Sequence, residues 1–169
     1  MPSPHNFSAG RLTRAALLTA IALTIFMAEA QIPAPVPVPG VKLGLANIVT
    51  VYAMYILGPG DTLMILISRI FLGAVFSGQM MTLLYSLGGG LCCFAAMLFL
   101  RRLLSRDYLW LASSLSAVFH NLGQVLVAAA VMRTWVVMSY LPYLVLSGIC
   151  SGLFTGLCTQ LLIRRLNKI

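Results

Sequence analysis

The chain has 169 residues, of which 60% are hydrophobic and only 8% are charged. Soluble domains carry roughly 25% charged residues, so this composition excludes a water-soluble domain. The net charge is +8, but the basic residues flank apolar segments, where they meet anionic lipid head groups. The sequence therefore predicts a protein embedded in membrane lipid, with no nucleic acid partner.

The apolar runs, taken in chain order, predict an all-α integral membrane protein with six transmembrane helices in one bundle, forming a single domain over 1–169. Each run is close to the roughly 20 residues needed to cross a bilayer. The weakest divisions are the GPGD turn at 58–61 and the SGQ break at 77–79. The predicted spans are 12–30, 41–58, 62–78, 81–100, 109–132 and 140–163.

The first span has the order of a secretory signal, because Arg11 and Arg14 precede an apolar run. The run is nevertheless about 18 residues long, which is enough to span a membrane. No clear small-residue cleavage site follows it. We therefore interpret it as a retained first helix.

The distribution of basic residues predicts the orientation. With the N-terminus inside, only Lys42 and Arg133 lie outside and Arg69 lies within a span, which satisfies the positive-inside rule. Both termini are therefore expected on the cytoplasmic side of a prokaryotic plasma membrane. The remaining basic residues are all cytoplasmic in this arrangement: Arg11, Arg14, Arg101, Arg102, Arg106, Arg164, Arg165 and Lys168.

The expected outer loop between the first two spans, 31–40, carries proline at every second position from Pro33 to Pro39. Alternating prolines block helix formation and keep a chain extended. Such a stiff loop suits a lid over a binding site, and equally suits a plain connector.

Residues for catalysis and metal binding are scarce. The only acids are Glu29, Asp61 and Asp107, which are too far apart along the spans to pair for acid–base work or to bind magnesium. No phosphate-binding loop is present, so any energy must come from a partner or a gradient. The cysteines lack the spacing of a zinc site; they are Cys92, Cys93, Cys150 and Cys158. We therefore expect a protein that is not an enzyme, without catalytic residue, metal or cofactor.

Arg69 lies near the middle of the third predicted span. An arginine at that depth costs roughly 2.5 kcal/mol or more, so it should face the bundle interior and have a partner. One interpretation is an anchor for an anionic substrate group. The other is an ion pair with Glu29.

The fifth span carries a polar stripe. Ser113, Ser116, His120 and Gln124 share one helical face, and Asn121 flanks it. Polar side chains in the membrane must face other helices or water. Hydrogen bonds between helices would explain the hydroxyls, but three larger polar groups exceed what packing needs, so a binding site is favoured.

Small residues indicate close helix contacts. Ala16 and Ala20 share one face of the first span, and Glu29 points nearly opposite to it at 100° per residue. The alanine face suits another helix, whereas the carboxylate suits the interior. A similar ladder in the last span predicts tight packing within the bundle; it comprises Gly148, Gly152 and Gly156.

Two segments carry a family resemblance, PGVKLGLANIV at 39–49 and HNLGQ at 120–124. They resemble the Gx transporter family, which is also catalogued as heptaprenyl diphosphate synthase component I. That family is in turn similar to the substrate-binding S subunits of energy-coupling factor importers. The resemblance implies six helices, a vitamin-like ligand near the outer face, and docking on a transmembrane coupling subunit and two ATPases. Docking would use small residues of the first helix, which Ala16 and Ala20 match.

The sequence thus favours the substrate-binding subunit of an importer for a small vitamin-like or isoprenoid or quinone-precursor molecule. A non-catalytic membrane subunit of a prenyl diphosphate synthase is the alternative, and a purely structural membrane subunit is a third reading. The candidate substrate-binding residues are Glu29, Lys42, Asn47, Arg69, His120, Asn121 and Gln124.

Overall fold

The computed structural model describes residues 9–32, 44–78 and 80–166, and all regular structure within them is helical. These residues contain six α-helices and two 3₁₀ segments, η1 (Arg106–Tyr108) and η2 (Trp135–Tyr140). The α-helices are α1 (Ala9–Glu29), α2 (Asn47–Ile56), α3 (Pro59–Ser77), α4 (Met80–Leu103), α5 (Leu109–Met132) and α6 (Leu141–Leu166). The predicted all-helical class is confirmed.

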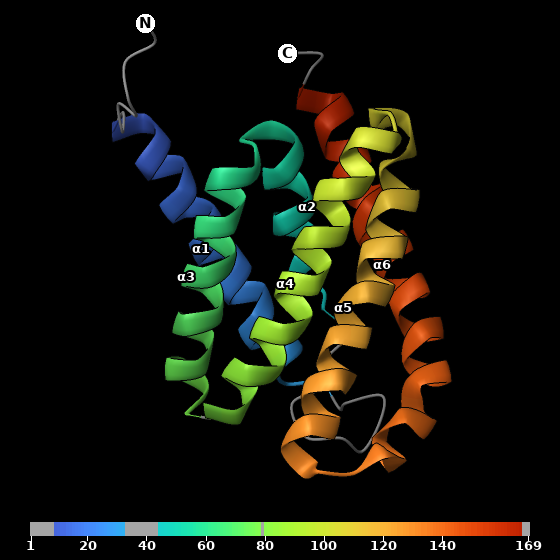
Figure 1. Ribbon diagram of the computed structural model, residues 1–169. Helices are drawn as coiled ribbons and strands as arrows, with labels where there is room; N and C mark the ends of the chain where they lie inside the picture. Colours follow the sequence, from blue (N-terminus) through green and yellow to red (C-terminus); the bar gives the residue numbers. More distant parts are fainter. Residues whose placement is uncertain (1–8, 33–43, 79, 167–169) are drawn as a thin grey trace, which may run out of the picture.

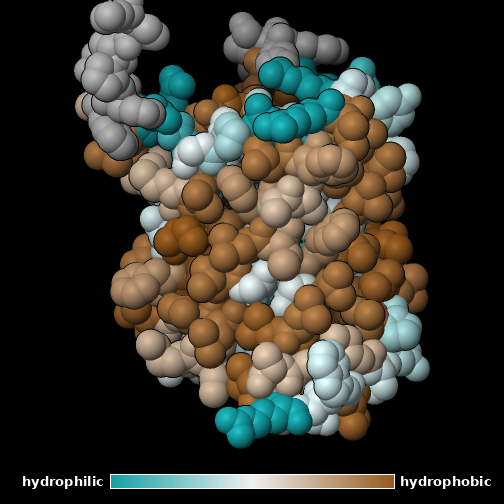
Figure 2. All heavy atoms as spheres, in the orientation of Figure 1, coloured by the Kyte–Doolittle hydropathy of each residue, from teal (hydrophilic) through white to brown (hydrophobic). Residues whose placement is uncertain are grey.

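Five of these described helices are long and apolar enough to cross a membrane. Their outward residues are largely apolar, and Figure 2 shows a broad hydrophobic band with hydrophilic residues gathered towards its two ends. A lipid-facing surface has this pattern because apolar side chains are stable among lipid tails, whereas charged side chains are stable among head groups and in water. The chain is thus a multi-pass membrane protein.

The second predicted span differs from expectation. Within the described part of 41–58, helix α2 has only ten residues. At 1.5 Å per residue the helix is about 15 Å long, which is half the thickness of a bilayer core. Gly44 (φ +80°) and Gly58 (φ +96°) flank it, each with a backbone conformation that favours glycine. Hydropathy alone could not detect this, because the residues before α2 are as apolar as the helix itself.

The helices form one bundle in which α2 is the innermost element. Neighbours along the chain pack together: α3 contacts α4, α4 contacts α5, and α5 contacts α6, while α1 lies against α3 (Figure 1). Short α2 touches α1, α3, α4 and α6, and it buries Val51, Ala53 and Met54 almost completely. Consequently its first residue, Asn47, lies inside the bundle rather than at a membrane surface.

The start of α1 and the end of α6 lie at the same end of the bundle (Figure 1). The junctions between α2 and α3 and between α4 and α5 lie at this end too. An even number of helices that alternate in direction produces this arrangement. The cytoplasmic location of this end remains a prediction from the basic residues.

The glycine ladder of α6 packs directly on α5, as predicted. A Cβ atom at Gly152 would come within 2.6 Å of Ser114 Cα, and one at Gly156 within 2.6 Å of Trp110 Cα. No side chain fits in that space. The two helix backbones therefore approach as closely as small residues allow.

Candidate functional site

Buried polar side chains from five helices lie close together in the bundle, and we call them the central cluster. All of them except Asn47, which adjoins Arg69, line one small cavity. They come from α1, α2, α3, α4 and α5, and each is at most 8% exposed. The central cluster comprises Glu29, Asn47, Arg69, Ser86, His120 and Gln124.

Glu29, at the last residue of α1, faces the start of α2. Its Oε1 accepts a hydrogen bond of 2.6 Å from the Gly44 backbone N–H. The N-terminal end of a helix carries partial positive charge, which favours a carboxylate. Gly44 is required at this place, since a Cβ there would lie 2.9 Å from Asn47 Nδ2 and 3.3 Å from His120 Cδ2.

Arg69 enters the central cluster from α3 and is 5% exposed. Its Nη2 donates a long hydrogen bond of 3.4 Å to Asn47 Oδ1, and the guanidinium lies within electrostatic range of Glu29. Arg69 Nε has no hydrogen-bond partner among the described residues. A buried charge requires both opposite charge and hydrogen bonds, and those described here leave part of the guanidinium unsatisfied.

His120 and Gln124 enter from α5, where a separation of four residues places them on one face. They pack on α4 at Gly89, where a Cβ would come within 2.7 Å of Gln124 Cγ and 2.9 Å of the His120 carbonyl. Glycine at this point of α4 gives both side chains their room. His120 Nδ1 and Gln124 Oε1 have no hydrogen-bond partner within the described chain.

The central cluster therefore offers hydrogen-bonding groups that the described protein atoms leave unused. Asn47 Nδ2 and Arg69 Nε are donors, Gln124 Oε1 is an acceptor, and His120 Nδ1 can be either. Each unsatisfied buried group costs about 1–3 kcal/mol. A ligand that combines an anionic or carbonyl group with a donor would satisfy donors and acceptors together.

The cavity at the central cluster has a volume of about 10 Å³, which is room for about one water molecule. A larger ligand would need its lining elements to move apart. Among these, α1 lies furthest to the outside, with 22% of its apolar stretch buried against 50% for that of α5. Phe26 on α1 also lines the cavity and packs on Gly73 of α3.

Three other predicted residues lie away from the central cluster, and a fourth falls outside the described residues. Asn121 faces α6, where its Nδ2 donates a 2.6 Å hydrogen bond to the Leu144 carbonyl. Lys42 lies outside the described residues. Ala16 and Ala20, predicted for docking, are both exposed on the outside of α1, whereas Glu29 of the same helix is buried.

The hydroxyls of the α5 stripe serve packing. Ser113 Oγ and Thr155 Oγ1 of α6 are hydrogen-bonded at 3.0 Å, and Ser116 Oγ donates to the Ala112 carbonyl of its own helix at 2.6 Å. The predicted stripe thus divides into a packing half and a half that belongs to the central cluster.

Sequence reasoning missed Ser86 and the role of Gly89. Both lie in α4, where a run of three glycines occupies positions 88–90. Ser86 lines the same cavity as Gln124, but no pattern in the sequence distinguishes it from other serines in apolar helices.

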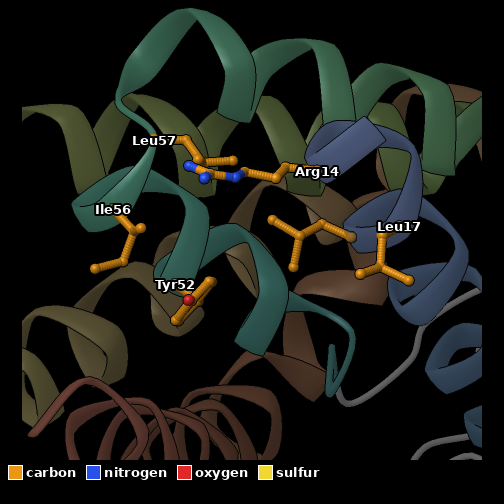
Figure 3. Close-up of a pocket in the computed structure, with 6 residues that line it drawn as sticks. Arg14, Leu17, Tyr52, Ile56 and Leu57 are labelled. Carbon is orange, nitrogen blue, oxygen red and sulfur yellow. The ribbon is translucent and has the colours of Figure 1, made fainter. Parts of the chain in front are cut away.

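A second recess lies between α1 and α2 (Figure 3). It has a volume of about 280 Å³, and Arg14 extends from α1 across it towards Leu57 at the end of α2. An adjoining recess of about 290 Å³ shares Leu18 and Tyr52 and is otherwise apolar. Together they form an apolar groove, the α1–α2 groove, with one guanidinium at its end.

The three acids of the chain have separate roles. Asp61, at the start of α3, forms an ion pair of 2.6 Å with Arg11, and Asp107 contacts Arg164 at 3.4 Å. Among the described residues, no group of three His, Cys, Asp or Glu could hold a metal ion.

Comparison with known proteins gives one match. The sequence model of a family described as heptaprenyl diphosphate synthase component I matches residues 18–162, which is most of the chain. No curated protein and no solved structure matches the chain.

Proposed function

We propose that this chain, which belongs to the heptaprenyl diphosphate synthase component I family, is the substrate-binding membrane subunit of an importer for a small polar molecule. The observation that supports the proposal is the central cluster. Polar side chains in the membrane are costly and are concentrated at substrate pathways. Four of its residues carry atoms that no described protein atom satisfies.

Each residue of the central cluster has a role in the proposal. Arg69 and Asn47 donate hydrogen bonds to an anionic or carbonyl oxygen of the ligand. The bond from the Arg69 guanidinium is the stronger of the two, because it is charge-assisted. Gln124 and His120 bind the opposite edge of the ligand. Glu29 holds the start of α2 in place through Gly44. A vitamin-like molecule with one acidic and one amide-like edge fits this set.

Transport would depend on partners in the cell membrane. The sequence contains no phosphate-binding loop, so ATPase subunits and a transmembrane coupling subunit would supply the energy. Ala16 and Ala20 form the proposed docking face. Their exposure on α1, opposite to buried Glu29, leaves them accessible to another helix. In this account the chain itself is not an enzyme.

A thermal-stability screen tests the proposal. Small polar metabolites would be added to the purified protein, and a compound that binds the native state raises its melting temperature. We expect a hit whose effect is lost in His120→Ala and kept in Ser113→Ala, a variant of the packing half of the same helix face. A hit that is unaffected by His120→Ala would place binding elsewhere, and the absence of any hit would argue against a binding subunit.

The name of the family suggests a second candidate function, that of a non-catalytic membrane subunit of a prenyl diphosphate synthase. The α1–α2 groove favours it, because an apolar trough that ends at Arg14 suits a prenyl chain with a charged head. Affinity purification from membranes distinguishes the candidates. Co-purifying ATPases would support the importer, whereas a co-purifying prenyl synthase would support the second function.

A further inference from the structure

A third recess lies at the end of the bundle that holds both chain ends, where α2 meets the junction of α4 and η1. Its volume is about 300 Å³, and it is separate from both the central cluster and the α1–α2 groove. Its lining is largely polar. The residues around it are Met54, Tyr55, Arg101, Leu104, Ser105 and Arg106.

Arg101 is fixed in place by α2. Its Nη1 donates to the Met54 carbonyl at 3.2 Å and contacts Met54 Sδ at 3.4 Å. The last carbonyls of a helix lack partners within the helix and attract positive charge, which explains this position. Among the described residues, only Nη1 of this guanidinium has a hydrogen-bond partner, and the side chain lines the recess.

Arg106 adds a second positive charge at the same recess. Both guanidinium groups lie within electrostatic range of the Tyr55 hydroxyl. Neither forms an ion pair with a carboxylate among the described residues, because Asp107 contacts Arg164 instead. Two like charges beside one recess repel each other, and an anion bound there would lower that repulsion.

Tyr55 provides the second, independent sign of a ligand. Its hydroxyl oxygen is buried and has no hydrogen-bond partner within the described chain. Ser105 supplies a further hydroxyl at the rim of the recess. Two arginines and two hydroxyls match a tetrahedral oxyanion, since guanidinium binds phosphate through paired hydrogen bonds.

We propose that Arg101, Arg106, Ser105 and Tyr55 form a binding site for a phosphate group at this end of the bundle. The phosphate belongs either to the head group of an anionic phospholipid or to a soluble phosphate compound, because both present the same oxyanion. The site is independent of the central cluster and of the importer proposal.

The test compares Arg106→Gln with Arg102→Gln. Arg102 is an exposed neighbour of equal charge that does not line the recess, so it reports the general loss of surface charge. In one arm, inorganic pyrophosphate is titrated against protein in neutral detergent at constant ionic strength. In the other, protein in nanodiscs of phosphatidylcholine with phosphatidylglycerol is analysed by native mass spectrometry for retained phosphatidylglycerol.

We expect one arm to show binding that is about tenfold weaker in Arg106→Gln, and also weaker in Tyr55→Phe, but unchanged in Arg102→Gln. The arm that responds identifies the source of the phosphate. Equal losses of binding affinity in the Arg102 and Arg106 variants would show that the probe binds diffuse surface charge, and would overturn the proposal. Binding of neither probe by the parent protein would overturn it as well.

Discussion

In the proposed binding site, Arg69 supplies the positive charge of the central cluster. It is a buried charge whose hydrogen bond to Asn47 is long and whose Nε has no described partner. A charge that served stability alone would be expected to have short bonds to all its donors, since desolvation of a charge is so costly. Two interpretations remain from the sequence, an anchor for substrate and a counter-charge for Glu29, and they predict different behaviour of variants.

The first prediction separates them. Arg69→Gln should reduce ligand binding at least tenfold, because a charge-assisted contact is lost. If Arg69 only neutralises Glu29, the single variant leaves an unpaired buried carboxylate and loses several kcal/mol of stability. The double variant with Glu29→Gln would then recover both stability and binding. Melting temperature and ligand affinity of both single variants and the double decide between the two roles, and a double variant that binds like the parent contradicts a substrate anchor.

Among the helices, close packing at glycines positions the His120 and Gln124 side chains of the central cluster. The ladder of α6 brings α5 close on one side, and Gly89 of α4 receives His120 and Gln124 on the other. Helix α5 is therefore held between two close contacts. Its orientation fixes which polar side chains face the cavity.

The second prediction concerns this contact. Gly152→Ala places a methyl group 2.6 Å from the Ser114 Cα, and overpacking of this kind costs about 1–3 kcal/mol. A lower melting temperature is expected. Gly60→Ala is the matched control, since a Cβ at Gly60 meets nothing within 4 Å and its φ needs no glycine. Equal melting temperatures for the two variants would show that the backbones do not approach as described.

The third prediction concerns the outer face of α1. Tryptophan at Ala16 or Ala20 should prevent assembly with a coupling subunit, because a large side chain blocks close helix approach. Ligand binding should persist, since neither position lines the central cluster. Leu146→Trp on exposed α6 serves as the control for a bulky lipid-facing residue. Pull-down yields that are the same for all three variants would exclude the alanine face as the docking surface.

Sequence patterns predicted the long helices well because hydrophobic runs and turn residues determine them. Helix α5 begins and ends at the predicted 109 and 132, and Gly78 ends α3 in a left-handed conformation as the weak break at 77–79 suggested. The shortness of α2 could not be predicted. It depends on where Gly44 turns the backbone inside the bundle, and apolar composition carries no information about that.

Part of the candidate site could also be predicted from the sequence. Polar side chains in a membrane must face inwards, so Glu29, Arg69, His120 and Gln124 were identifiable one by one. Helical geometry separates Asn121 from His120 by 100°, enough to direct it to α6. Ser86 was not identifiable, because a lone serine in an apolar helix has no distinctive pattern.

For the whole molecule, the fourth prediction is its orientation in the membrane. The end of the bundle where α1 begins and α6 ends should be cytoplasmic, because eight basic residues flank that side and two the other. Single cysteines at Gln31 and Leu166, in a cysteine-free version, would be labelled from outside intact cells with an impermeant reagent. Labelling is expected at residue 31 only. Labelling at residue 166 but not at 31 would invert the topology and place the central cluster at a different access route.

The most direct test of the central claim, that the central cluster binds a small polar molecule, is native mass spectrometry of the protein released gently from membranes. The parent protein and Ser113→Ala should each carry the same added small mass, and Arg69→Gln should lack it. Fragmentation of the released compound would identify the substrate. A parent protein that carries no such mass, or an Arg69→Gln variant that retains it in full, would contradict the account.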